Sequence, residues 1–206
     1  IATLATSPDA KTRSLAVELL GQRRNAGSAA ALIKTAADAD EQVRLASLKA
    51  LAGLATAADL PALLALLVQA PSPQETEAAE AAASAVCARQ TGREACAATI
   101  IAAMNDAPAA AKPALLRVLR AAAGAKAIAA VRAAAAGADA DVKTEALRVL
   151  CAWPSPEAIP DLVQLAKNPA DAKLKILALR GCLRLIPIQD VPAEKKLAAA
   201  KDVMAL

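Results

Sequence analysis

Residues 38–67 read DADEQVRLASLKALAGLATAADLPALLALL, and this stretch carries the pattern that decides the fold. An acidic, turn-forming joint leads to Arg44, and apolar residues follow four and seven positions later, at Leu48 and Leu51. Spacings of four and seven place side chains on one stripe of an α-helix. A break and Pro61 then introduce a second apolar stretch, so the segment predicts two short helices joined by a turn.

The same pattern recurs along the chain, in copies that begin about 31 to 35 residues apart. The copies begin at Arg13, Arg44, Glu77, Lys112, Lys143 and Lys175, of which the one at Glu77 is degenerate. The second helices of these units are expected over residues 28–37, 58–69, 93–104, 125–136, 156–167 and 193–205. One helical hairpin cannot bury its apolar face alone, so stacked neighbours would form one continuous core.

The repeat predicts an all-α fold, an α-α superhelix or solenoid of about six helical hairpins. We expect a single domain over residues 1–206. The opening residues, with Ile1 and Leu4, look like the end of a preceding second helix, because a terminal repeat normally presents a polar outer face. This pattern favours a segment of a larger protein.

Composition supports the helical interpretation and excludes several function classes. The chain has 62 alanines and 28 leucines among 206 residues, with one Trp and no Phe, Tyr or His. This composition is unlike that of a β-sandwich, which is rich in aromatic and β-branched residues, and a mean hydropathy of +0.38 is too high for a disordered chain. Every mechanism or metal site that needs imidazole is excluded. Small side chains would let stacked helices approach closely.

The charge balance gives little support to nucleic-acid binding, and the apolar runs give little support to a membrane span. The chain carries 24 basic and 20 acidic residues, a net charge of +4. The chain also lacks the aromatic side chains on which the bases of a nucleic acid could stack. The most apolar run, residues 60–68, is shorter than the roughly 20 residues that a membrane helix needs. The sequence has neither a CxxC pair nor a Gly-rich phosphate loop, so no metal or cofactor is expected.

Residues 38–67 and the stretch DADVKTEALRVLCAWPSPEAIPDLVQLAKNP (139–169) resemble the bacterial HEAT-like repeat, of the type also found in phycobilin lyases. The matching features are the acidic joint, the pair Val43–Arg44, the Ala/Leu stripe and the Pro-Ala-Leu-Leu of the second helix. The resemblance implies an α-solenoid. It also implies a role in binding other macromolecules, with no catalytic residues in common.

We therefore expect a protein that is not an enzyme but an interaction scaffold or spacer, whose partner is another protein or flanking domains of the same chain. Residues 146–186 also resemble arrays in large multidomain bacterial proteins that carry sugar-active or cell-surface domains. This second resemblance offers an alternative, an accessory module outside the cytoplasm, and it favours a periplasmic or secreted location over a cytoplasmic one. A lyase-like binder of a small ligand is a further alternative.

Two columns of basic residues are candidates for ligand contacts. For the first, the resemblance implies structural pairing with acidic residues at the repeat joints. The basic members are Arg13, Arg44, Lys112, Lys143 and Lys175, and the acidic members are Asp38, Asp40, Asp139, Asp141 and Asp171. The second column lies five residues further on, at Lys49, Arg117, Arg148 and Arg180. It is interpreted either as a solvated helix face or as a contact surface for an acidic partner.

Trp153 and the four cysteines complete the candidate residues. Trp153 is a candidate partner contact, because Trp is common at binding hot spots, but Leu54 and Leu185 at equivalent positions favour a core role. Cys87 and Cys96 flank a turn and would face each other across a helix pair, as a disulfide or as two buried thiols. Both interpretations remain open, whereas the remaining two cysteines are expected to be free and buried.

Overall fold

A computed structural model describes residues 2–23 and 26–206, and within these ranges it contains α-helices, short 3-10 segments and no β-strand. The predicted all-α fold of helical hairpins is confirmed. The expected second helices coincide with α2, α4, α6, α8, α10 and α12 to within three residues at each end. Contacts divide the chain into two compact units, residues 1–122 and 123–206. The expectation of one domain over the whole chain stays a prediction.

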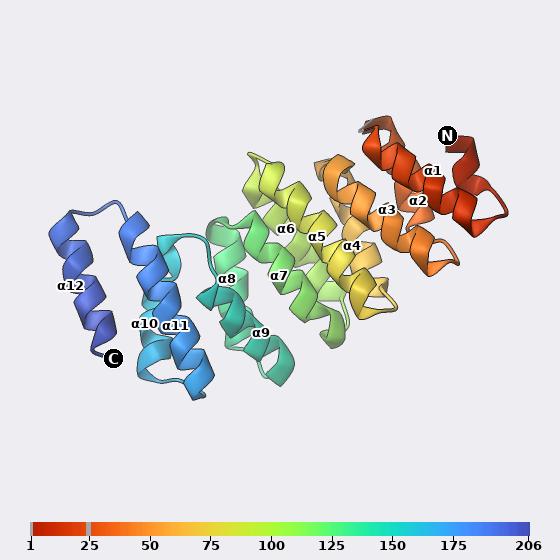
Figure 1. Cartoon of the computed structure of the whole chain (residues 1–206). Helices are drawn as coiled ribbons and strands as arrows, with labels where there is room; N and C mark the ends of the chain where they lie inside the picture. Colours follow the sequence, from red (N-terminus) through yellow and green to blue (C-terminus); the bar gives the residue numbers. More distant parts are fainter. Residues whose placement is uncertain (1, 24–25) are drawn as a thin grey trace. The chain divides into compact units, whose positions relative to one another are not determined.

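The first unit is a two-layered array of helices, which Figure 1 shows lying side by side in chain order. Its helices are α1 (Ala10–Gln22), α2 (Ala29–Thr35), α3 (Glu41–Leu54), α4 (Leu60–Gln69), α5 (Pro73–Arg89), α6 (Arg93–Asp106) and α7 (Lys112–Ala122). The first helices of the hairpins form one layer, in which α1 packs on α3, α3 on α5 and α5 on α7. Each second helix packs most closely on the first helix of the next hairpin.

The second unit repeats this arrangement (Figure 1). Its helices are α8 (Gly124–Ala135), α9 (Ala140–Cys151), α10 (Ile159–Lys167), α11 (Ala172–Leu185) and α12 (Ala193–Met204). Helix α9 packs on α11, while α8 packs on α9 and α10 on α11. None of the described helices of the chain combines the length and the apolar character that crossing a bilayer requires.

Side-chain caps set where several first helices begin. The capping residue is an Asp or a Ser in extended conformation, and its side chain accepts hydrogen bonds from backbone N–H groups two or three residues later. These caps are Asp9, Asp40, Ser72, Asp139 and Asp171. The turn-rich joints of the sequence therefore act as helix start signals, each worth about 1 kcal/mol.

The third hairpin does not follow the register expected from the sequence. A copy beginning at Glu77 would bury Ala81, but Ala81 is exposed, whereas Ala79 and Ala82 are fully buried. These two residues lie four and seven positions after Glu75. Because a shift of two residues turns a helix by about 200°, the copy begins at Glu75, which is 31 residues after Arg44.

Small residues stand where helices approach most closely. A Cβ atom added to Gly21 of α1 would lie 2.9 Å from the Ala50 Cβ of α3. In the second unit, a Cβ on Gly181 of α11 would lie 2.7 Å from the backbone oxygen of Cys151, at the end of α9. The structure therefore supports the explanation of the alanine-rich composition by close helix packing.

Candidate functional site

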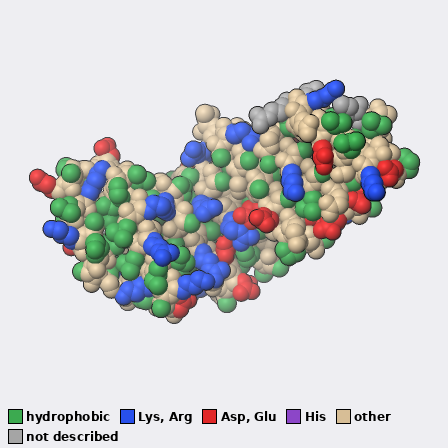
Figure 2. All heavy atoms as spheres, in the orientation of Figure 1, with side chains coloured by type: hydrophobic (Ala, Val, Ile, Leu, Met, Phe, Trp, Pro, Cys, Tyr) green, Lys and Arg blue, Asp and Glu red, His purple; other side chains and the backbone are tan. Residues whose placement is uncertain are grey.

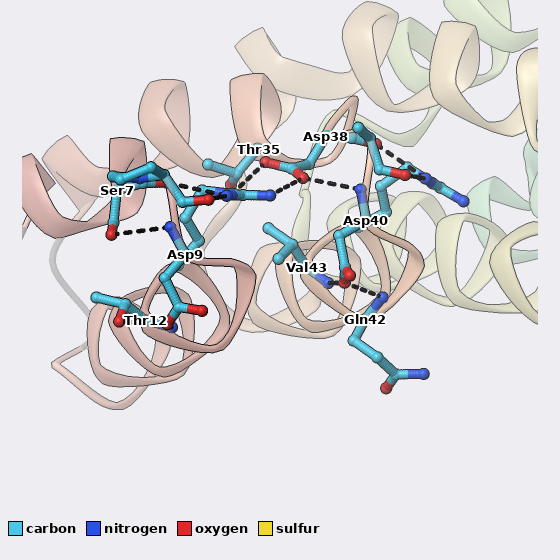
Figure 3. A network of polar contacts seen from close by, with 12 residues as sticks. Ser7, Asp9, Thr12, Thr35, Asp38, Asp40, Gln42 and Val43 are labelled. Atoms are coloured by element: carbon cyan, nitrogen blue, oxygen red, sulfur yellow. Dashed lines mark hydrogen bonds and ion pairs between the residues drawn. The ribbon is translucent and has the colours of Figure 1, made fainter.

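The joint between the first two hairpins holds a two-bond ion pair (Figure 3). The Nε and Nη2 atoms of Arg13 donate to the two carboxylate oxygens of Asp38, each at 2.8 Å. The remaining nitrogen, Nη1, donates to the backbone oxygen of Ser7 at 2.9 Å. Hydrogen bonding from Arg13 lowers the pKa of the Asp38 carboxyl below its ordinary value. This geometry ties the start of α1 to the joint that precedes α3.

The next joint repeats the arrangement with a different carboxylate. Arg44 of α3 donates from Nε and Nη2 to both oxygens of Glu75 at 2.9 Å, and from Nη1 to the backbone oxygen of Asp38 at 2.9 Å. Only 3% of the Glu75 side chain is exposed. Hydrogen bonding from Arg44 lowers the pKa of Glu75, because it stabilises the charged carboxylate despite its burial.

These pairs confirm part of the pairing that the resemblance implied and correct the rest. Asp38 forms an ion pair with Arg13 as implied. Arg44, however, pairs with Glu75, which lies within a helix and is not one of the acidic residues of the joints. Asp40, Asp139 and Asp171 act as helix caps. Within the described residues, Lys112 and Lys143 form no ion pair with these joints, and Lys175 Nζ donates to the backbone oxygen of Leu206 at 2.7 Å.

Two further arginines join neighbouring helices by a route that the sequence analysis missed. Arg89, at the end of α5, donates to the backbone oxygens of Ala52 and Ala55 at 2.7 and 2.8 Å, where α3 ends. Arg184 of α11 donates to the backbone oxygen of Trp153 at 2.7 Å, where α9 ends. The last backbone carbonyls of a helix have no hydrogen-bond partner within the helix, and an arginine can donate to them. Its positive charge also interacts favourably with the partial negative charge at the C-terminal end of the helix.

A fifth arginine joins two second helices of the second unit. Arg132 of α8 donates from Nη2 to Asp161 of α10 at 2.7 Å and to the backbone oxygen of Glu157 at 2.9 Å. The guanidinium is partly exposed, so its contribution to stability is modest. Together these five arginines connect helices of neighbouring hairpins within each unit.

The second basic column lies on the exposed face of the first helices. In α7, Arg117 pairs with Glu80 of α5 at 2.8 Å, and in α9, Arg148 lies 3.6 Å from Glu145. Lys49 of α3 and Arg180 of α11 are exposed, and neither forms an ion pair within the described ranges. Two of the four candidates therefore have intramolecular partners.

Trp153 is a core residue, so the partner-contact interpretation of this residue is wrong. Its side chain is fully buried, and its indole Nε1 donates to Glu157 Oε1 at 2.9 Å. The large ring is buried where α9 ends, and Leu185 at the equivalent position, the end of α11, is also buried. A side chain without exposed surface cannot anchor a partner unless the hairpin opens.

All four cysteines are buried and have free thiols. Burial, followed by the proximity of Cys96, raises the pKa of Cys87 to about 12. Cys96 lies near enough to contribute to this raised pKa, so the structure brings these two residues together as the sequence predicted. Burial likewise raises the pKa of Cys151 to about 11. The disulfide between Cys87 and Cys96 stays a prediction, while the buried thiols of Cys151 and Cys182 are confirmed.

Grooves open to solvent run between consecutive second helices. In the first unit, a groove of about 560 Å³ lies between α4 and α6, with mostly small or aliphatic walls. It is lined by Pro61, Leu64, Ala65, Val68, Gln69, Thr99, Ala102, Ala103, Asp106 and Ala107. In the second unit, a groove of about 520 Å³ lies along α8 and α10, next to the Arg132–Asp161 pair. In the described part of the chain, no group of three acidic or Cys side chains could hold a metal ion.

Comparison with known proteins agrees with the helical-hairpin architecture. Residues 1–85 match a family model described as HEAT repeats. Residues 1–85 of this chain therefore contain HEAT repeats. No match to this chain was found among the curated proteins.

One solved structure supports the same fold for this chain. One similar structure is the complex of CpcE and CpcF of phycocyanin lyase from Nostoc sp. PCC7120, at 17% identity and a TM-score of 0.50. The match covers 98% of this chain and 92% of the other. Human deoxyhypusine hydroxylase in complex with glycerol also matches, at 17% identity and a TM-score of 0.34, over 99% of this chain and 82% of the other.

Proposed function

We propose that this HEAT-repeat chain is a non-catalytic scaffold that binds a segment of another protein. The observation that carries the proposal is the groove between α4 and α6. Exposed Ala65 on α4 and Ala102 on α6 face the groove, and Gln69 and Asp106 supply polar atoms among its lining residues. A groove between two parallel helices, with an apolar floor and a few polar atoms, suits a helical or extended peptide.

The arginine contacts make this groove a preformed surface. Arg44 fixes α3 against α5, and Arg89 ties the end of α5 back to the end of α3. The helices that carry the groove pack on this layer, since α4 contacts α5 and α6 contacts α7. A preorganised groove lowers the entropic cost of binding, because little of the scaffold needs to become ordered when the partner arrives.

The test is an unbiased selection of peptides that bind the purified chain, from a random library displayed on yeast. Selected peptides are then measured against Ala65→Glu and Ala102→Glu, which place a charge in the groove at exposed helical positions. Ala81→Glu makes the same change at an exposed position of α5, outside the groove, and serves as the matched control.

We expect peptides with dissociation constants of about 1–100 μM, and a loss of at least about ten-fold for the groove variants. The control variant should bind within about two-fold of the unchanged protein. Failure to enrich any peptide would overturn the scaffold proposal. If oligosaccharides or a small chromophore bind while no peptide does, the accessory sugar-active module or the lyase-like binder is the better interpretation.

A further inference from the structure

Charges at one repeat position alternate in sign across the first unit. This position lies five residues after the residue at which each copy begins, on the exposed face of the first helix. It holds Glu18 in α1, Lys49 in α3, Glu80 in α5 and Arg117 in α7. Because each of these helices packs on the next, each charge has a neighbour of opposite sign, and Arg117 contacts Glu80 directly at 2.8 Å.

The second unit breaks this alternation. The same position holds Arg148 in α9 and Arg180 in α11, and these two helices pack side by side. Two arginines therefore face solvent on neighbouring helices, whose axes in such packing lie about 8–10 Å apart. Glu145 offsets the charge of Arg148 only partly, from 3.6 Å, and Arg148 is still 52% exposed.

Helix α11 adds apolar side chains beside these charges. Ile176 and Leu183 are 50% and 42% exposed, and Lys173 and Arg180 are exposed on the same face. Their spacing of three, four and three residues keeps all four on one stripe of the helix, with the two apolar residues about 10 Å apart along the axis. The helix has four basic residues and no acidic one.

Figure 2 shows the corresponding surface of the second unit, where basic and hydrophobic side chains lie interspersed over α9 and α11 and acidic side chains lie mostly toward the edges. Within the chain, Arg184 is already engaged, because it donates to the backbone oxygen of Trp153. Lys173, Arg180 and Arg148 remain available to an outside partner. Exposed aliphatic residues among solvent-exposed basic side chains are a surface that a complementary partner can cover favourably.

We propose that the face formed by Arg148, Lys173, Ile176, Arg180 and Leu183 binds an acidic amphipathic segment of a partner protein. The carboxylates of the partner pair with the guanidinium groups, and two of its apolar side chains, about seven residues apart in a helix, cover Ile176 and Leu183. This inference rests on the proposed scaffold function and names both a surface and the chemistry of its partner.

The arrangement of the face favours a peptide over an anionic membrane. Helices that lie in a membrane interface separate a broad apolar face from a basic one and carry aromatic residues at the boundary. On α11 only two aliphatic side chains project, they alternate with basic residues along the stripe, and the helix has no aromatic residue. The planar guanidinium group of arginine can donate two hydrogen bonds to one carboxylate, which suits carboxylates held at a fixed spacing on a helix.

The experiment uses the full chain and two synthetic peptides of about 14 residues, which span roughly 20 Å as a helix. The first has two leucines seven positions apart with glutamates between and beside them. The second has lysine in place of each glutamate. Binding is measured by fluorescence anisotropy for the unchanged chain, Arg180→Glu, and the double variant Ile176→Ala/Leu183→Ala. Lys126→Glu, at an exposed position of α8, is the matched charge control.

We expect the acidic peptide to bind at least about ten-fold more tightly than its basic twin, and more weakly as salt rises. Arg180→Glu and the double alanine variant should each weaken binding of the acidic peptide about ten-fold, and Lys126→Glu should weaken it less than about two-fold. Arg180→Glu should also improve binding of the basic peptide. The circular dichroism spectrum of each variant should match that of the unchanged chain, which shows that the variant is folded.

Equal binding of the two peptides would overturn the inference, and so would equal losses in Arg180→Glu and Lys126→Glu. Tighter binding to phosphatidylserine vesicles than to the acidic peptide would also overturn it in favour of a membrane. The random-peptide selection separates the two proposals. If it yields peptides that bind in the α4–α6 groove while the acidic peptide does not bind, the scaffold function stands and this surface fails. An empty selection together with no binding of the acidic peptide overturns both.

Discussion

The guanidinium of Arg44 holds the carboxylate of Glu75 by two bonds of 2.9 Å, across 31 residues of sequence. Arg13 holds Asp38 in the same way at 2.8 Å. Each arginine also donates to backbone oxygens of the joint that precedes its own helix. One side chain thus connects the beginning of a hairpin to the hairpin that follows, which fixes the register between them.

Removal of the Glu75 charge should destabilise the protein. Glu75→Gln keeps the size of the side chain but leaves the Arg44 charge without a compensating carboxylate, and we expect a loss of about 2–3 kcal/mol in the free energy of unfolding. Urea denaturation followed by circular dichroism measures this change. Glu77→Gln, two residues away on the same helix and exposed, is the control and should lie within about 0.5 kcal/mol of the unchanged protein. Equal effects of the two substitutions would contradict the role of the pair.

Stability should fall in acid because of the same two carboxylates. The pKa of Glu75 is lowered from its ordinary value of 4.5, and that of Asp38 from 3.8, chiefly by hydrogen bonds from Arg44 and Arg13. A carboxyl with a lowered pKa in the folded state binds fewer protons there than in the unfolded state. Its contribution is therefore fully present above the unfolded pKa and is lost as the pH falls from about 4.5 through the folded pKa.

Denaturation at a series of pH values between about 7 and 3 tests this dependence. The double variant Asp38→Asn/Glu75→Gln should start less stable and lose less stability over the acidic range, because it lacks the two linked groups. If its stability declines as steeply as that of the unchanged protein, other carboxylates cause the acid sensitivity.

The same Gly-to-Ala substitution should have opposite effects at two positions. At Gly181 an added Cβ would lie 2.7 Å from the backbone oxygen of Cys151, so Gly181→Ala must displace α11 from α9 and should cost about 1–3 kcal/mol. At exposed Gly53 of α3 nothing lies within 4 Å of the added atom, so Gly53→Ala should stabilise by up to about 1 kcal/mol. Thermal and urea unfolding of both variants give the signs. Destabilisation by Gly53→Ala would contradict this account.

The buried thiols should react slowly in the folded protein. The pKa values of Cys87 and Cys151 are raised to about 12 and about 11, so near pH 8 the nucleophilic thiolate is scarce and buried. Maleimide labelling followed by mass spectrometry should show little modification of the native chain and labelling of all four cysteines in urea. Peptide mapping without a reductant, on chain produced in an oxidising compartment, tests the predicted Cys87–Cys96 bridge.

Much of the fold could be predicted from the sequence, because its signals are local. The spacing of Leu48 and Leu51 after Arg44 identified a helix face, and Asp40 and Asp139 at the joints marked helix starts. The register of the third hairpin was predicted wrongly. Its stripe consists of alanines on every side, so no difference in side-chain size distinguished buried Ala79 from exposed Ala81, and only the packed neighbours show which face is inside.

The candidate surfaces depended more strongly on tertiary structure. The sequence allowed Trp153 to be either a partner contact or a core residue, and its burial in the structure supports the core role. Arg89 and Arg184 could not be identified from the sequence, because their acceptors are backbone oxygens, which every residue has and which therefore leave no signature.

The sequence by itself determined the helices, their hairpin order and the small side chains at their contacts, since propensity, capping and a period near 3.6 act over a few residues. Tertiary structure alone decided which charges pair between hairpins. Glu75 with Arg44 and Glu80 with Arg117 meet only after hairpins stack, because electrostatic pairing depends on distance in space and the partners lie 31 and 37 residues apart in the chain. The same stacking leaves Arg148 and Arg180 as neighbours of like sign, facing outward.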